Sequence, residues 1–154
     1  MALESIVKRT EAASPVTSIL LVEDNPIDAQ MLRESLAERG TFGFELRSVA
    51  SMSAAESYLA VEEFCVIVLD LFLPDCTGTE TYQRARASAP NTPILVLTAL
   101  ENSLLADRLL SAGAEGYFVK GEKANLDFIE SIESVVHRRS EQCLAHQQFT
   151  GGAK

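Results

Sequence analysis

Four short apolar runs constrain the fold of this chain most, because each one ends at a polar residue able to do chemistry. The runs and the residues that follow them are Ile19–Val22 before Glu23 and Asp24, Val66–Leu69 before Asp70, Ile94–Leu97 before Thr98, and Tyr117–Val119 before Lys120. Short, almost purely apolar runs are typical of parallel strands buried on both faces. Ligands of open parallel sheets bind beyond the carboxyl ends of the strands. We therefore expect these polar residues to converge on one site.

The segments between the runs predict the rest of the fold. One further strand, Phe44–Ala50, alternates in polarity, and Leu73–Gly78 is expected to be a loop. Helices are expected over Pro26–Arg39, Ser53–Ala60, Thr79–Ala89 and Ser103–Ala112, and from about Ala124 past His137. Strands and helices then alternate five times, which predicts an α/β fold with a doubly wound parallel sheet covered on both faces. The flavodoxin-like (βα)5 strand order 2-1-3-4-5 places Asp24 beside Asp70.

Two helices show an apolar stripe that predicts which face they bury. In the first helix the apolar positions are Ile27, Met31, Leu32 and Leu36, and in the last helix they are Leu126, Ile129, Ile132 and Val136. Spacings of three and four residues are typical of an amphipathic helix.

Length and composition favour one globular domain. The chain has 154 residues, and we expect a leader over 1–17, a domain over 18–140 and a tail over 141–154. No apolar run reaches the roughly 18 residues of a membrane span, and the first residues do not resemble a signal peptide, so a cytoplasmic location is expected. A net charge of −9 argues against direct nucleic-acid binding. The three cysteines, Cys65, Cys76 and Cys143, lack metal-ligand spacing and are expected to be reduced thiols.

Three acids at one sheet edge predict a bound cation. Two carboxylates 4 Å apart repel by about 4 kcal/mol at an effective dielectric near 20. A hard divalent ion with oxygen ligands, such as Mg²⁺, is the natural counter-ion for Glu23, Asp24 and Asp70. Each polar residue alone has an ordinary structural reading, such as a helix cap for Asp24 or a local backbone bond for Thr98. Their joint occurrence at strand ends favours a site for a phosphoryl group.

These motifs resemble the receiver domain of two-component response regulators. The matching stretches are Ile19–Pro26, Val68–Asp75 with Gly78, Val96–Ala99, Ala112–Ala114 and Tyr117–Lys120, within Ser18–His137. The resemblance implies that Asp70 is the phosphoacceptor, whose carboxylate attacks a phosphohistidine and forms an acyl phosphate. It also implies a Mg²⁺ site, with Mn²⁺ as an alternative ion. Its ligands would be Asp24, Asp70, the backbone carbonyl of Phe72 and, through a water, Glu23.

The resemblance implies roles for five further positions. Lys120 would pair with one phosphoryl oxygen, and Thr98 would hydrogen-bond to another and move towards it. Tyr117 would rotate into the space that Thr98 leaves. Small Ala99 would leave room for the phosphoryl group. Leu100, like the Phe72 side chain, would flank the group and the path of attacking water.

A receiver domain implies signalling rather than turnover of a substrate. The phosphoryl donor would be a sensor histidine kinase or a histidine phosphotransfer protein, and the domain would catalyse only its own phosphorylation and dephosphorylation. The face formed by Ser103–Ala112, Tyr117–Val119 and the helix from Ala124 would bind a downstream protein or a second copy. We expect a single-domain regulator, since only a short segment follows the last helix. Gly121 departs from the family, which usually has proline after the lysine.

Three alternatives are weaker. A phosphatase of the haloacid-dehalogenase type needs a second acid two residues after its nucleophile, where this chain has Phe72. In a flavodoxin-like cofactor binder, Glu23 and Asp24 would repel the cofactor phosphate. A degenerate receiver that acts only by protein contacts would not need the intact set of acids, hydroxyl and lysine.

Overall fold

The computed structural model describes residues 16–39, 43–121 and 127–138. Most of the expected leader, the tail, Gly40, Leu126 and Cys143 lie outside these ranges. Within them, a five-stranded parallel sheet has the order β2-β1-β3-β6-β7. The strands are β1 (Thr17–Val22), β2 (Phe44–Val49), β3 (Val66–Leu69), β6 (Ile94–Thr98) and β7 (Gly116–Val119). With β6 and β7 as fourth and fifth strands, the predicted order 2-1-3-4-5 is confirmed.

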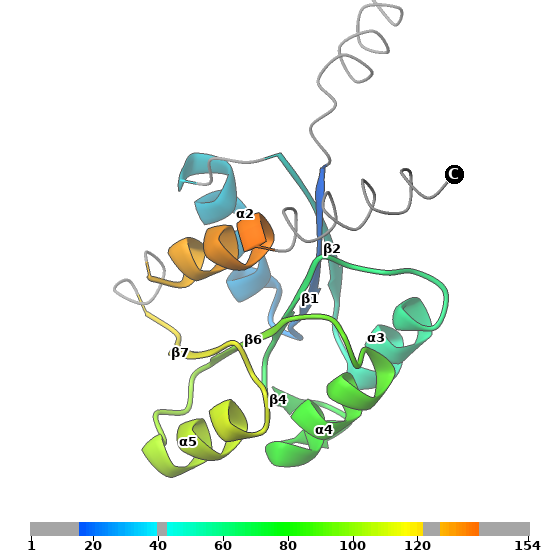
Figure 1. Ribbon diagram of the computed structural model, residues 1–154, viewed down its shortest axis with the longest axis vertical. Helices are drawn as coiled ribbons and strands as arrows, with labels where there is room; N and C mark the ends of the chain where they lie inside the picture. The colour runs from blue at the N-terminus through cyan, green and yellow to red at the C-terminus, as the bar shows by residue number, and fades with distance from the viewer. Residues whose placement is uncertain (1–15, 40–42, 122–126, 139–154) are drawn as a thin grey trace, which may run out of the picture.

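Helices cover both faces of the sheet (Figure 1). Helix α2 (Pro26–Arg39) and the helical residues 127–138 lie on one face, where Leu36 and Phe128 pack into a common apolar cluster. Helices α3 (Met52–Leu59), α4 (Thr79–Ser88) and α5 (Ser103–Ser111) lie on the other. Successive strand residues point to opposite faces, so neighbouring residues of β1 and β3 belong to different clusters. This is why Ile19–Val22 of β1 and the whole of β3 are apolar.

Helix α2 has the predicted bounds but not the predicted buried face. Leu32 and Leu36 are buried, whereas Ile27 is 69% and Met31 50% exposed. At about 100° per residue, Ile27 lies about 180° around the helix from Leu36, so the four apolar residues do not share one face. Ala29 packs instead against the cluster that contains Leu32 and Leu36. In the helix over 127–138, Ile129 and Ile132 are buried as predicted, and Val136 is partly buried.

The segment predicted as a loop contains a small hairpin. Strands β4 (Phe72–Leu73) and β5 (Cys76–Thr77) pair antiparallel around Pro74 and Asp75. The Asp75 carboxylate accepts hydrogen bonds from the backbone N–H groups of Met52 and Ser53, both at 2.9 Å. These bonds lower the pKa of Asp75 to about 2. The hairpin that follows Asp70 is thereby joined to the start of α3.

Within the described residues, no helix combines the length and the apolar character that a membrane span requires.

Candidate functional site

The parallel register brings the acids together at the carboxyl edge of the sheet. Val22 pairs with Leu69, so the residues that follow β1 and β3 are neighbours. The backbone N–H of Glu23 donates to Val49 O at 2.9 Å, and that of Asp70 donates to Val22 O at 3.0 Å. One carboxylate oxygen from each of Glu23, Asp24 and Asp70 lies within 4.8 Å of the others. Glu23 and Asp70 are buried and Asp24 is exposed, so the acid cluster opens to solvent on the Asp24 side.

Glu23 carries the largest perturbation in the acid cluster. Burial is the main cause, and it raises the pKa of Glu23 from 4.5 to about 7. Hydrogen bonds from Lys120 and from the backbone N–H of Asn25 oppose this shift, whereas the charge of Asp70 adds to it. Burial, more than repulsion from Asp70, therefore disfavours the charged form of Glu23.

Lys120 lies among carboxylates. Its Nζ is 2.5 Å from Glu23 Oε1, 2.9 Å from Asp28 Oδ2 and 3.1 Å from Asp70 Oδ2. Burial lowers the pKa of Lys120, but the bonds to Glu23 and Asp28 and the charge of Asp70 outweigh burial and raise it above its ordinary value. Lys120 is therefore a permanent ammonium within reach of the Asp70 oxygen.

Asp28 is a site residue that the sequence reasoning missed. It lies in the first turn of α2, where an acid is ordinarily explained by the helix dipole. Asn25 caps this helix, because its Oδ1 accepts from the backbone N–H of Ile27 at 2.9 Å. One feature of the sequence could have pointed to Asp28. It lies four residues, or about one helical turn, after Asp24, at the same end of α2.

Thr98, Leu100 and Tyr117 form a second group. Thr98 is fully buried at the end of β6, and its Oγ1 accepts from the backbone N–H of Leu100 at 3.4 Å. The Tyr117 hydroxyl donates to Leu100 O at 2.8 Å, and burial raises the pKa of Tyr117. The N–H of Lys120 donates to Thr98 O at 2.8 Å, which connects this group to the acid cluster. Hydrogen bonds thus connect Thr98 to Tyr117 through the backbone of Leu100.

Three residues that follow the ends of β3 and β6 are exposed. Ala99 is exposed, and the apolar side chains of Phe72 and Leu100 are 41% and 37% exposed. The backbone N–H of Phe72 donates to Asp70 Oδ1 at 3.1 Å. This bond leaves Asp70 with one oxygen towards the hairpin and the other towards Lys120.

The donor set of the acid cluster fits a magnesium ion. Mg²⁺ takes oxygen ligands at about 2.0–2.1 Å in an octahedron, so its ligand atoms lie about 3–4 Å apart. The three carboxylate oxygens lie within 4.8 Å of one another, close to this spacing. Lys120 supplies one positive charge beside three acids. A divalent cation could therefore bind without giving the cluster a large net positive charge.

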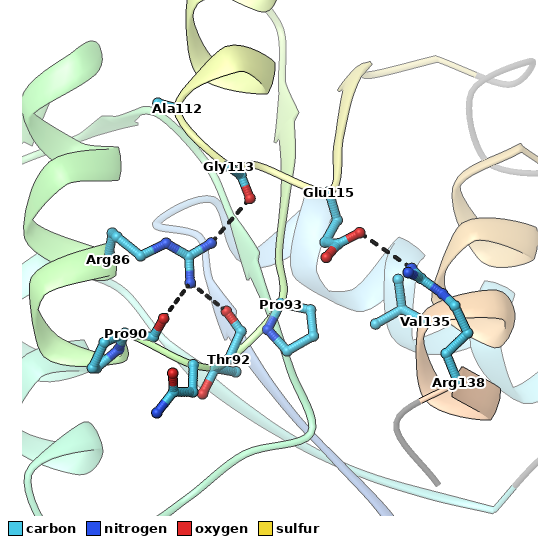
Figure 2. A pocket seen from close by; sticks show the side chains of 10 residues that line it. Arg86, Pro90, Thr92, Pro93, Ala112, Gly113, Glu115, Val135 and Arg138 are labelled. Atoms are coloured by element: carbon cyan, nitrogen blue, oxygen red, sulfur yellow. Dashed lines mark hydrogen bonds and ion pairs between the residues drawn. The ribbon is translucent and has the colours of Figure 1, made fainter. Parts of the chain in front are cut away.

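A cavity of about 500 Å³ lies at the opposite, amino edge of the sheet (Figure 2). The guanidinium of Arg86 enters it and donates to the backbone oxygens of Thr92 at 2.7 Å and Gly113 at 3.2 Å. Glu115 and Arg138 form an ion pair at 3.1 Å across the same cavity. These bonds join the loops that precede β6 and β7, so this cavity is structural and does not belong to the acid cluster.

Comparison with known proteins identifies the family. Residues 19–131 match the response regulator receiver domain, and the chain belongs to this family. It is 36% identical over 104 residues to the transcriptional regulatory protein BasR of Escherichia coli, which covers 66% of this chain and 45% of BasR. The chain spans about half or less of the length of the curated relatives it matches.

Solved structures agree with the fold. A CheY-like response regulator receiver domain protein from Methanospirillum hungatei superimposes with a TM-score of 0.69 at 23% identity, covering 83% of this chain and 99% of that one. The phosphorylated cyanobacterial phytochrome response regulator RcpA superimposes with a TM-score of 0.66 at 25% identity, covering 77% and 92%. The present chain therefore has the CheY-like α/β fold of a two-component receiver.

Proposed function

We propose that this domain accepts a phosphoryl group on Asp70 in a magnesium-dependent reaction. The observation that carries the proposal is the position of the Asp70 carboxylate, which lies 3.1 Å from the Lys120 ammonium within the cluster of three acids. This arrangement lies at the carboxyl edge of the sheet in a chain of the receiver family. The family implies a cognate histidine kinase, and we propose a sensor kinase or a histidine phosphotransfer protein as the donor.

In the proposed reaction an Asp70 oxygen attacks the phosphorus of a phosphohistidine. The new O–P bond forms as the P–N bond breaks, and its electron pair goes to the imidazole nitrogen, which takes a proton from water. Asp24, Asp70, the carbonyl of Phe72 and, through a water, Glu23 would hold the ion. Mg²⁺ supplies positive charge against the oxygens of the transferring group. Lys120 pairs with one of these oxygens, and exposed Ala99 leaves them room.

We further propose that phosphorylation acts on partners through Thr98 and Tyr117. Thr98 moves towards a phosphoryl oxygen, Leu100 moves with it, and Tyr117 turns into the vacated space. The output face consists of α5, β7 and the helix over 127–138. Leu104 and Leu110 on α5 are exposed by 79% and 44%, which supports a protein-binding role. The partner is a downstream protein or a second copy of the domain.

We also propose that the domain works in the cytoplasm and that its own phosphorylation and dephosphorylation are its only catalysis. The expectation that it functions without an attached output module stays a prediction, because the curated relatives extend beyond the matched region.

Treatment with acetyl phosphate tests the proposal. Intact-mass spectrometry should show one added phosphoryl group with Mg²⁺ and none with a chelator. The adduct should be stable in acid and lost in base, as an acyl phosphate is. Asp70→Asn should abolish it, whereas Asp75→Asn, a matched change in the adjacent hairpin, should retain it. Full labelling of Asp70→Asn would contradict the assignment.

A further inference from the structure

The acidic residue at the start of α2 has no part in the reaction as proposed so far. Asp28 Oδ2 lies 2.9 Å from Lys120 Nζ, although 92 positions separate the two residues in the chain. The Asp28 side chain is 34% exposed and the Lys120 side chain 20%. Their contact joins the first turn of α2 to the residue that follows β7.

Both partners in this contact are held by their backbones. The Oδ1 of Asn25 accepts from the N–H of Asp28 at 3.4 Å, and Ala29 N donates to Asn25 O at 3.1 Å, which fixes the first turn of α2. Lys120 N donates to Thr98 O at 2.8 Å. Because Asp28 has a short side chain on a capped helix, it presents its carboxylate from a defined position.

The ammonium of Lys120 has three hydrogens, and each has a separate carboxylate within reach. Two of those carboxylates have other roles in the proposed reaction: Glu23 helps to hold the metal ion, and Asp70 also accepts the phosphoryl group. When they turn their oxygens to a metal ion and a phosphoryl group, Lys120 loses two partners. Asp28 is the partner that stays available, because it lies outside the three acids, Glu23, Asp24 and Asp70, that could hold a metal ion.

We propose that Asp28 is a positioning residue that holds the Lys120 ammonium beside Asp70 during phosphoryl transfer. This inference rests on the proposed function of Asp70. Asp28 acts through Lys120 and touches neither the phosphoryl group nor the metal. A misplacement of about 1 Å can cost about 100-fold in rate. The phosphoryl oxygens themselves attract the ammonium, so loss of Asp28 should slow transfer by about tenfold.

Nuclear magnetic resonance of the lysine ammonium groups tests the contact without any phosphorylation. The chain has four lysines, Lys8, Lys120, Lys123 and Lys154, so the Lys120 signal can be assigned by its loss in Lys120→Arg. An ammonium held by charge-assisted hydrogen bonds is protected from exchange with water. In the magnesium-loaded protein, this protection should persist in wild type and be lost in Asp28→Ala.

The matched control is Glu34→Ala, which removes the same charge from an exposed position of the same helix. It should leave the Lys120 signal unchanged. If Lys120 stays equally protected in magnesium-loaded Asp28→Ala, the inference is overturned whether or not Asp70 is phosphorylated.

The second readout is the rate of phosphorylation by acetyl phosphate at saturating Mg²⁺. Asp28→Ala should lower the maximal rate about tenfold with little change in the half-saturating concentration of acetyl phosphate. Asp28→Asn keeps an acceptor oxygen and should fall between Asp28→Ala and wild type, and Glu34→Ala should match wild type. An unchanged or faster rate in Asp28→Ala would mean that Asp28 does not position Lys120 or draws it away, and either result overturns the inference. Absence of phosphorylation in wild type would instead overturn the proposed function.

Discussion

The lifetime of the phosphorylated protein should depend on two apolar side chains at the edge of the site. Phe72 and Leu100 lie two residues beyond Asp70 and Thr98, and they are 41% and 37% exposed. Their backbones are fixed, since Phe72 N donates to Asp70 Oδ1 and Leu100 O accepts from the Tyr117 hydroxyl. Neither side chain has a hydrogen-bonding group with which to orient an attacking water. We therefore expect the aspartyl phosphate to decay slowly without a phosphatase.

The double substitution Phe72→Asn/Leu100→Glu would place polar groups at both positions. A side chain that positions a water as general base contributes typically about 10²–10⁴-fold in rate. Both positions are more than a third exposed, so the new polar groups should be only partly ordered. They should therefore supply only part of this rate acceleration. We expect at least about tenfold faster decay, which corresponds to about 1.4 kcal/mol of activation free energy.

The assay follows intact mass over time after acetyl phosphate is removed by rapid desalting. Val61→Glu is the matched control, because Val61 is 81% exposed and lies in the connection to the amino end of β3, away from the acids. It should decay like wild type. If the double mutant loses phosphate no faster than wild type, Phe72 and Leu100 do not set the lifetime. Water would then enter by another route, such as the loop at Gly121.

Three further predictions follow from particular contacts. Asp24→Ala should lower magnesium affinity at least about tenfold in a calorimetric titration, because it removes one of the two carboxylates proposed to bind the ion directly; equal affinity would place the ion elsewhere. Asp75→Ala should cost about 1 kcal/mol of unfolding free energy at neutral pH, as loss of a helix cap does. Since the folded-state pKa of Asp75 is about 2 against an ordinary 3.8, this stabilisation is present above about pH 4 and is lost as pH falls through about 2. Urea unfolding across that range measures it, and a difference from wild type that does not shrink with pH contradicts the reasoning. Phosphorylation should alter amide hydrogen exchange in α5 and β7, and changes confined to other elements would refute the proposed output face.

The strand order and the convergence of the acids could be predicted because they depend on strong, simple patterns. A run such as Val66–Leu69 is apolar at every position, and all four residues are fully buried. Once such strands alternate with helices, right-handed crossovers leave few topologies, and the carboxyl ends must share an edge. The residues that follow those strands were therefore predictable as neighbours.

Other features could not be predicted from the sequence alone. The apolar stripe of α2 overlaps two faces, and only packing against the sheet shows that Leu36 is buried and Ile27 is exposed. The β4–β5 hairpin has two residues per strand, too few to show alternation. The contact of Asp28 with Lys120 depends on how α2 is placed beside the end of β7, and no local pattern encodes it.

Mapping the phosphorylated residue tests the central claim most directly. Borohydride reduces an aspartyl phosphate at its acyl carbon and so leaves a permanent mark on the modified residue. After treatment with acetyl phosphate and Mg²⁺, peptide sequencing by mass spectrometry should find this mark on Asp70 alone. A mark on Asp24, Asp28 or Asp75 in the wild-type protein would contradict the account.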